Sequence, residues 1–200
     1  MDIMEVIRGR RSVRAFRPEA PSRALLEQII AAAGWAPSPH GRQPWRFAVI
    51  TSAERRAGLA EAMGAEWRAQ LALDGQDEAT IELRHRRSRE RIIGTPVIIV
   101  ACLYLEDLDV YPDAGRQAAE TTMAIQSLGC AIQNMLLAAY ALDLDTGWMC
   151  APLFCPEAVR AALGLAPTLQ PHALIQVGYA AKEPVHRSRR TSDELVVRWD

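Results

Sequence analysis

The chain has 200 residues, is 50% hydrophobic and 24% charged, and carries a formal net charge of -1 with a pI near 6.4. This composition predicts one folded domain over residues 1–200 and argues against global attraction to nucleic acid, so any anion must be bound by a local cluster. The longest apolar run, at 95–105, is far shorter than the ~20 residues that span a bilayer. The acidic, amphipathic N-terminus lacks the apolar core of a signal peptide, and we expect a cytoplasmic protein.

Hydrophobic spacing near the N-terminus predicts two helices and a stiff loop. Ile3 and Ile7 lie at helical spacing, and a second helix is predicted to begin at Pro21 and Ser22. The following stretch APSPHGRQPW, residues 36–45, contains three prolines. We expect a loop there that holds its backbone groups in fixed positions.

The next segment predicts a strand followed by two helices. WRFAVIT, at 45–51, has the composition of a strand, and Thr51 with Glu54 forms a capping-box pattern at its end. That pattern predicts a helix over 52–73. After the turn sequence DGQDE, a second helix carries IELRHRRSRERI, at 81–92.

The second half predicts a buried strand and a long helix. VIIVACLYL, at 97–105, is a continuous apolar run, which indicates a central strand covered on both faces. Asp113 is expected to cap a helix over 114–142, whose apolar surface suits a core or a subunit interface. DTGWMCAP, at 145–152, predicts a strand, and Pro156 predicts the first position of a short helix.

The C-terminal segment predicts one internal strand and one that lacks a partner. ALIQVGYA, at 173–180, has the pattern of a buried strand, and ELVVRW, at 194–199, resembles a terminal strand with no neighbour in sequence. An unpaired apolar strand is a liability unless another sheet receives it. We therefore expect an α+β fold, with a central mixed or antiparallel sheet flanked by helices, in which a second subunit receives this segment.

The cysteines and histidines show no spacing typical of a metal site. No CxxC pair is present, and each cysteine lies in an apolar stretch, which favours buried free thiols. The cysteines are Cys102, Cys130, Cys150 and Cys155. We expect no structural metal.

Two basic clusters suggest a phosphate site. GRRSVRAF, at 9–16, places Arg10, Arg11 and Arg14 around Ser12, and HRSRR, at 186–190, is a second cluster. Guanidinium groups offer a planar fork of donors that suits phosphate oxygens, and a serine hydroxyl adds another donor. A solvated turn is the alternative reading of the first cluster. GxSxG, GxGxxG and GxxxxGK[ST] are all missing, so an elbow nucleophile, a Rossmann site and a P-loop are not indicated.

Taken in order, these segments resemble the nitroreductase family of flavin enzymes. The resemblance rests on RRSVRAF, on the loop ending QPW, on AIQNMLLAA before a strand that contains Gly147, and on a late basic cluster after GY. It implies an intertwined homodimer with C-terminal strand exchange that binds FMN at its interface. The cofactor residues that it implies are Arg10, Arg11, Ser12, Arg14, Ser38, Pro39, His40, Gly147, Trp148, Arg187 and Arg189. Gly41 stands where many members have asparagine.

In this resemblance the two basic clusters hold the FMN phosphate and Arg14 reaches the pyrimidine edge of the flavin. Gly147 and Trp148 lie beside the ring, and glycine permits close backbone approach. The chemistry takes place at the flavin N5, so no side chain is singled out as catalytic.

A narrower resemblance concerns FbiB-type flavin domains of coenzyme F-420 biosynthesis. Stretches such as PSPHGRQPWRF and ALGLAPTLQPHALIQVGYA carry it, and it implies reduction of the dehydro precursor of the deazaflavin F-420. That precursor is anionic, and LRHRRSRER, at 83–91, supplies five arginines; a solvated helix with Glu–Arg pairs is the alternative. The candidate acceptor-binding residues are Trp67, Arg68, Asp74, Arg84, Arg87 and Arg91.

Three alternatives remain open from the sequence. A general NAD(P)H-dependent nitro or quinone reductase would need no basic acceptor site. A non-catalytic flavin carrier would bind FMN without turnover. A nucleic-acid-binding module would use the arginines of 84–91 and bind with strong salt dependence, but the chain lacks interleaved aromatic residues.

Overall fold

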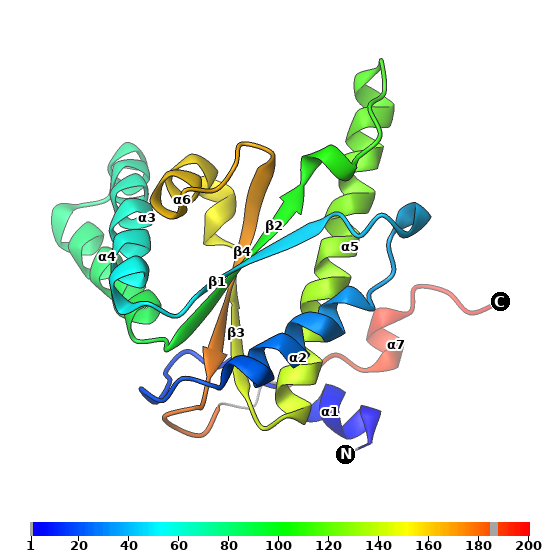
Figure 1. The fold of residues 1–200 in the computed structure, drawn as a ribbon, viewed down its shortest axis with the longest axis horizontal. Helices are drawn as coiled ribbons and strands as arrows, with labels where there is room; N and C mark the ends of the chain where they lie inside the picture. Colours follow the sequence, from blue (N-terminus) through cyan, green and yellow to red (C-terminus); the bar gives the residue numbers. More distant parts are fainter. Residues whose placement is uncertain (1, 185–187) are drawn as a thin grey trace.

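The computed structural model describes residues 2–184 and 188–200, and within them it has an α+β fold built on one antiparallel sheet (Figure 1). The strand order is β1-β2-β4-β3, so β2 and β4 are central. The strands are β1 (Trp45–Ile50), β2 (Val97–Tyr104), β3 (Asp145–Met149) and β4 (Leu169–Gly178). The helices are α1 (Ile3–Gly9), α2 (Arg23–Gly34), α3 (Ala53–Leu73), α4 (Glu78–Ile93), α5 (Ala114–Ala141), α6 (Pro156–Leu163) and α7 (Ser192–Leu195), and the 3-10 turns are η1 (Pro39–Gly41), η2 (Leu105–Asp107) and η3 (Ala151–Phe154).

Helices cover both faces of the sheet, as the apolar run of β2 predicts (Figure 1). Ile99 and its neighbours on one face pack against α2 and α5, whereas Ile98 and its neighbours on the other pack against α3, α4 and α6. The side chains of β2 from Val97 to Leu103 are almost completely buried. Alternate side chains point to opposite faces, so a strand covered twice must be apolar throughout.

The long helix α5 begins and ends as its sequence requires. Asp113 accepts a hydrogen bond from the Arg116 backbone amide at 2.9 Å, so it is the predicted N-cap. At the other end Asp143 adopts a left-handed conformation with φ 57°, and Leu144 N donates to Ala139 O at 2.9 Å. This pattern satisfies carbonyls that have no partner inside the helix.

Three sequence predictions are corrected by the structure. Ser52 rather than Thr51 caps α3, because its hydroxyl accepts from the Arg55 amide. β4 begins at Leu169, earlier than residue 173, because its first residues pair with the end of β2. Cys130 and Cys150 are exposed in this chain, whereas Cys102 and Cys155 are buried thiols.

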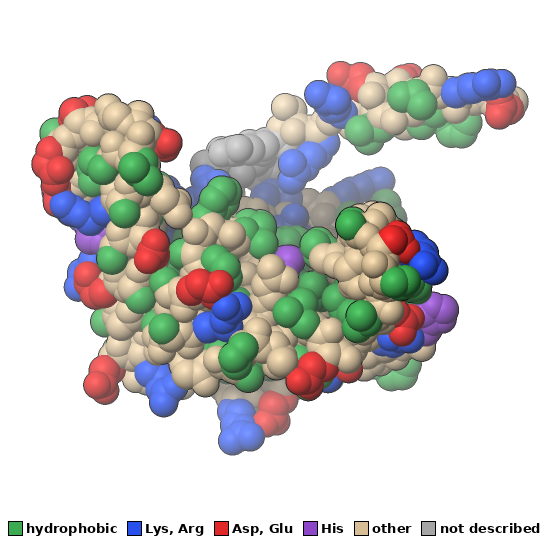
Figure 2. Space-filling view, turned by 90° about the horizontal axis from the view of Figure 1, so that it is seen from above, with side chains coloured by type: hydrophobic (Ala, Val, Ile, Leu, Met, Phe, Trp, Pro, Cys, Tyr) green, Lys and Arg blue, Asp and Glu red, His purple; other side chains and the backbone are tan. Residues whose placement is uncertain are grey.

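The C-terminal segment is the fourth correction. Residues 192–195, predicted in part as a strand, form the short helix α7, which Thr191 and Glu194 cap reciprocally. Residues 196–200 pair with no strand that the structure describes. Residues 191–200, here called the C-terminal arm, extend away from the body of the chain (Figure 2).

Among the described residues no helix has the length and hydropathy to cross a membrane.

His172 is a buried titratable group within the sheet. The register changes from Ala101 opposite Ala173 to Cys102 opposite Pro171, so His172 is the extra residue of a β-bulge. Its side chain is 8% exposed, and its Nε2 has no hydrogen-bond partner among the described residues. Burial lowers the pKa of His172 below its ordinary value of 6.5, because desolvation disfavours the charged imidazolium.

We predict that His172 makes the protein less stable in mild acid. The unfolded chain takes up the proton first as the pH falls below about 6.5, so the folded state loses stability from there downward. His172→Gln should remove this part of the pH dependence, which is at most about 1.4 kcal/mol per pH unit. Urea denaturation of both proteins at several pH values between 7.5 and 5.5 would measure it. Equal pH slopes would contradict the prediction.

Candidate functional site

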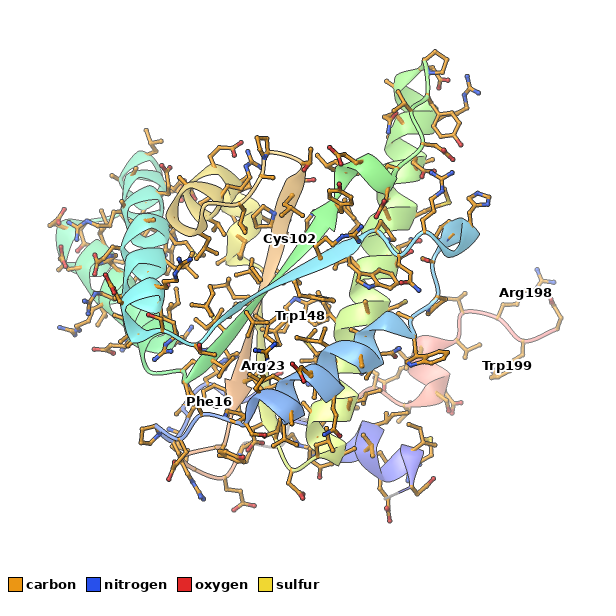
Figure 3. The ribbon with its side chains drawn as sticks, in the orientation of Figure 1. Phe16, Arg23, Cys102, Trp148, Arg198 and Trp199 are labelled. Carbon is orange, nitrogen blue, oxygen red and sulfur yellow. The ribbon has the colours of Figure 1, made fainter. Side chains whose placement is uncertain are left out.

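The first basic cluster is held in place by backbone hydrogen bonds to the sheet. Val13 N donates to Thr146 O of β3 at 2.8 Å, and Arg17 N donates to Tyr179 O at 2.8 Å. Ala181 N returns a bond to Ala15 O at 3.0 Å. Residues 12–17 therefore lie along the ends of β3 and β4, with Phe16 at that end of the sheet in Figure 3.

These bonds place the cluster at a cleft of about 800 Å³ between the two ends of the chain. Basic side chains surround it, with Glu183 as the acidic residue among the described ones. The residues that line the cleft are Ile7, Arg8, Arg10, Arg11, Ser12, Val13, Arg14, Ala15, Lys182, Glu183, Pro184 and Arg189.

Arg10 is the member of this cleft whose environment most favours an added anion. Desolvation by burial, followed by repulsion from Arg189 and Arg11, lowers the pKa of Arg10. Its Nε is buried and has no hydrogen-bond partner among the described residues. A buried charged donor without a partner is costly, and an anion in the cleft would offset both the repulsion and the missing bond.

Arg11 has a different role from its neighbour. Its Nη1 donates to the carbonyls of Arg8, Gly9 (3.0 Å) and Arg10 (2.8 Å), where α1 ends. A guanidinium at this position satisfies carbonyls that α1 cannot bond and interacts favourably with the helix dipole. Gly9 itself lies against Tyr140 of α5, because a Cβ there would come within 2.2 Å of the tyrosine Oη. Arg11 thus shapes the wall of the cleft.

The second group of predicted residues lies on β3. Gly147 is a close-approach glycine: a Cβ would lie 2.4 Å from Val13 O and 2.8 Å from Gln176 Oε1. The group that approaches Gly147 in this structure is therefore the chain's own segment 12–13. Trp148, the next residue, is 39% exposed, and Figure 3 shows its position on the sheet.

The proline loop lies elsewhere in the single chain. In Figure 1, η1 lies beside α5 toward the opposite end of the sheet from residues 10–16, so Ser38, Pro39 and His40 do not reach the cleft of this chain. The loop is nevertheless built rigidly. Ser38 Oγ accepts from Gln43 N at 3.0 Å, and His40 and Gln43 have left-handed φ values of 55° and 52°. Such backbone strain persists only where surrounding contacts hold it.

Ion pairs divide the arginines of the α3–α4 pair into two sets. Arg68 pairs with Glu78 at 2.8 Å and also with Glu82, and Arg89 pairs with Glu61 of α3. Arg86 approaches Glu90 at 4.0 Å. Of the other predicted acceptor residues, Trp67 is half-buried and Asp74 is the exposed C-cap of α3.

Arg84, Arg87 and Arg91, here called the arginine stripe, form the second set. They are exposed and form no ion pair with any residue that the structure describes. Residues three or four apart share one side of a helix, so the stripe occupies a flank of α4 different from the one that meets α3. In Figure 1, α4 lies on the far side of the sheet from α5.

The structure thus brings together five of the predicted cofactor residues at one cleft: Arg10, Arg11, Ser12, Arg14 and Arg189. Arg187 lies outside the described residues. Sequence reasoning missed Arg8, Lys182 and Glu183. Lys182 and Glu183 belong to the charged KEP stretch just after the last strand, which was the available sequence signal, although the nearby HRSRR cluster is more strongly basic.

Comparison with known sequences gives one family and several relatives. The profile described as "Nitroreductase family" matches residues 7–179. A protein named NADH dehydrogenase from Thermus thermophilus is 31% identical over 212 aligned positions, covering 95% of this chain and 92% of the relative. "Putative NAD(P)H nitroreductase YfhC" of Bacillus subtilis is 25% identical, covering 94% of this chain and 89% of that protein.

Solved structures match over nearly the whole chain. A structure described as a putative nitroreductase in complex with FMN, from Desulfovibrio desulfuricans, is 29% identical with a TM-score of 0.76, covering 100% of this chain and 98% of that one. The FMN-dependent nitroreductase NfnB of Mycobacterium smegmatis, solved in complex with NADPH, is 23% identical with a TM-score of 0.76, covering 98% of this chain and 97% of that one. The second likeness concerns the fold alone.

Proposed function

The chain belongs to the nitroreductase family, and on this premise we propose that it is an FMN-dependent oxidoreductase whose basic cleft holds the FMN phosphate. One observation carries the proposal: Arg10, half-buried and lacking a partner for its buried Nε among the described residues, lies with other cations at a cleft of about 800 Å³. A dianionic phosphate would complement this charge. A solvated turn would not bury the guanidinium.

The residues present fit a phosphorylated planar ligand. Arg10, Ser12 and Arg189 supply guanidinium and hydroxyl donors for a phosphate. Arg14 lines the same cleft and is the candidate for the pyrimidine edge, while Gly147 and Trp148 continue from it along β3. When bound, FMN supplies hydride transfer; the chain's residues bind the phosphate and orient the ring.

For the acceptor, we propose the dehydro precursor of the deazaflavin coenzyme F-420. The narrower sequence resemblance supports it, and so does the arginine stripe, which has no carboxylate partner among the described residues and would suit an anionic acceptor. The alternative is a general NAD(P)H-dependent nitro or quinone reductase. The names of the Thermus and Bacillus relatives favour that second function.

We also propose that the working unit is a homodimer. Ser38 to His40 lie away from the cleft of their own chain, so a second copy would have to bring them to it. The C-terminal arm exposes Val197 fully and Trp199 at 79%, and Figure 3 shows Trp199 at its outer end. α1 also exposes Ile3, which is 60% accessible. Exposed apolar side chains on an extended arm suit burial against another subunit.

We predict that replacing Arg10 with alanine weakens FMN binding. A charge-assisted hydrogen bond contributes about 1.5–3 kcal/mol, which corresponds to roughly 10- to 100-fold in affinity. Arg189→Ala should act in the same direction, and Arg55→Ala, an exposed position on α3, should have no effect. Titration of the apoprotein with FMN, followed by flavin fluorescence, would give the dissociation constants.

The same titration tests the assignment of the cofactor and of the protein class. Wild-type protein should bind one FMN per subunit. Unchanged FMN affinity in the Arg10→Ala and Arg189→Ala variants would remove the phosphate site from this cleft. A yellow protein that reduces no acceptor with any nicotinamide or deazaflavin donor would instead be a flavin carrier.

We predict that truncation after Arg190 dissociates the dimer. Loss of the arm removes Val197 and Trp199 from the proposed interface, so both the dimer fraction and the FMN content should fall. Sedimentation at micromolar concentration, with flavin absorbance recorded together with protein absorbance, would measure both. A wild-type protein that sediments as a monomer with FMN bound would contradict the dimer.

We predict that the arginine stripe serves the acceptor and not the flavin. Replacing Arg84, Arg87 and Arg91 with glutamine should raise the KM for dehydro-F-420 by about threefold to tenfold, with an effect that weakens at high salt because exposed charges are screened over about 8 Å. The KM for a small neutral quinone and the FMN affinity should not change.

A matched control carries the same loss of charge. The control replaces three arginines outside the stripe, Arg55, Arg86 and Arg89, with glutamine. This variant should keep the KM for dehydro-F-420 near the wild-type value. Equal losses in both triple variants, or for both acceptors, would exclude a specific role for the stripe. A wild-type enzyme that reduces quinones but not the deazaflavin would establish the general reductase.

A further inference from the structure

Two polar side chains are buried in the apolar layer between the sheet and α4. Gln176 of β4 and Thr95, just before β2, are each 1% exposed. Gln176 lies opposite Ile98 in the sheet, on the face that packs against α3, α4 and α6. A buried amide is costly unless it is hydrogen-bonded, so its partners define what it does.

Gln176 and Thr95 bond the last turn of α4 to the sheet. Gln176 Nε2 donates to Arg91 O at 2.8 Å and to Thr95 Oγ1 at 2.6 Å. Thr95 Oγ1 in turn donates to Arg91 O at 2.7 Å. Arg91 lies among the last residues of α4, whose carbonyls have no partner inside the helix. The two side chains therefore take the place of the missing helical bond.

The other end of Gln176, its Oε1, lies close to the segment that lines the cleft. Gln176 pairs with Gly147 across the β3–β4 ladder, and a Cβ on Gly147 would lie 2.8 Å from Gln176 Oε1 and 2.4 Å from Val13 O. The Gln176 amide oxygen and the Val13 carbonyl oxygen therefore both lie against the side of Gly147 that a Cβ would occupy, and Val13 lines the cleft together with Ser12 and Arg14. Gln176 thus contacts the end of α4 through its Nε2 and, through its Oε1, packs at Gly147 beside Val13 of the cleft segment.

We propose that Gln176 and Thr95 are positioning residues that fix the cleft segment 12–14 relative to the end of α4. The geometry itself is independent of the ligand, while its effect on FMN rests on the proposed function. Because Gln176 Oε1 and Val13 O both pack against Gly147, a shift of Gln176 is passed on through this contact to Val13 and to the groups beside it. Buried networks of this kind favour one arrangement over its neighbours.

The test compares Gln176→Leu with Thr95→Val, which remove the hydrogen bonds and keep much of the volume. Amide exchange of Val13, which donates to Thr146 O at 2.8 Å, should become about tenfold faster in both, while amides of the β1–β2 ladder keep the wild-type rate. In the double variant the Val13 amide should exchange no faster than in the more affected single variant, because both residues act on one network. FMN affinity should fall several-fold in parallel.

Gln170→Leu is the control in the same strand, because the Gln170 side chain makes no hydrogen bond with the described residues and lies outside the network. It should leave Val13 exchange and FMN affinity unchanged. Two results would overturn the proposal: wild-type exchange at Val13 in both folded variants, or equal acceleration of Val13 and the β1–β2 ladder, which marks a general loss of stability. Failure of the wild type to bind FMN would refute the proposed cofactor and leave the exchange result to decide this inference.

Discussion

The candidate site depends on the backbone bonds that fasten residues 12–17 to the ends of β3 and β4. The arginines of this segment carry like charges, and desolvation, followed by repulsion from Arg189 and Arg11, lowers the pKa of Arg10. Side chains on a free segment would move apart. Bonds to a sheet whose central strands are buried on both faces keep them together, so the stability of the core is what maintains a concentrated positive charge at its edge.

Much of the fold follows from periodicity and caps, because both are local. Asp113 and Pro156 mark helix starts correctly, and the apolar run of β2 identifies the centre of the sheet. Thr51 failed as a cap because Ser52, the next residue, offers the same chemistry. The terminal strand predicted over 194–199 was wrong at residues 194–195, because a reciprocal cap between Thr191 and Glu194 favours a helical turn there.

The site was less predictable, because the roles of similar residues differ by their surroundings. Arg10 and Arg11 are adjacent and both half-buried, yet Arg10 is repelled by Arg189 and Arg11, whereas Arg11 donates to carbonyls at the end of α1. On α4, Arg86 and Arg89 meet carboxylates, whereas Arg84 and Arg87 form no ion pair with any described residue. The Arg86–Glu90 pair lies within α4 and follows from i,i+4 spacing, but the partner of Arg89, Glu61, is on α3, so only the packing of the two helices reveals it. Gln176 gave no signal at all, since a single glutamine in a strand reads as an ordinary polar residue.

Among the described residues, the cleft draws its lining from two segments far apart in sequence, 7–8 with 10–15, and 182–184 with 189. This arrangement has a consequence for the order of events during synthesis. Arg10, Arg11 and Arg14 leave the ribosome before the strands of the sheet, whereas Lys182 and Arg189 emerge only after β4. Closing such a long loop is entropically unfavourable until the sheet between them has formed. The anion site is therefore assembled after the sheet, and a chain that stopped at the end of β4 would present a core without a complete cleft.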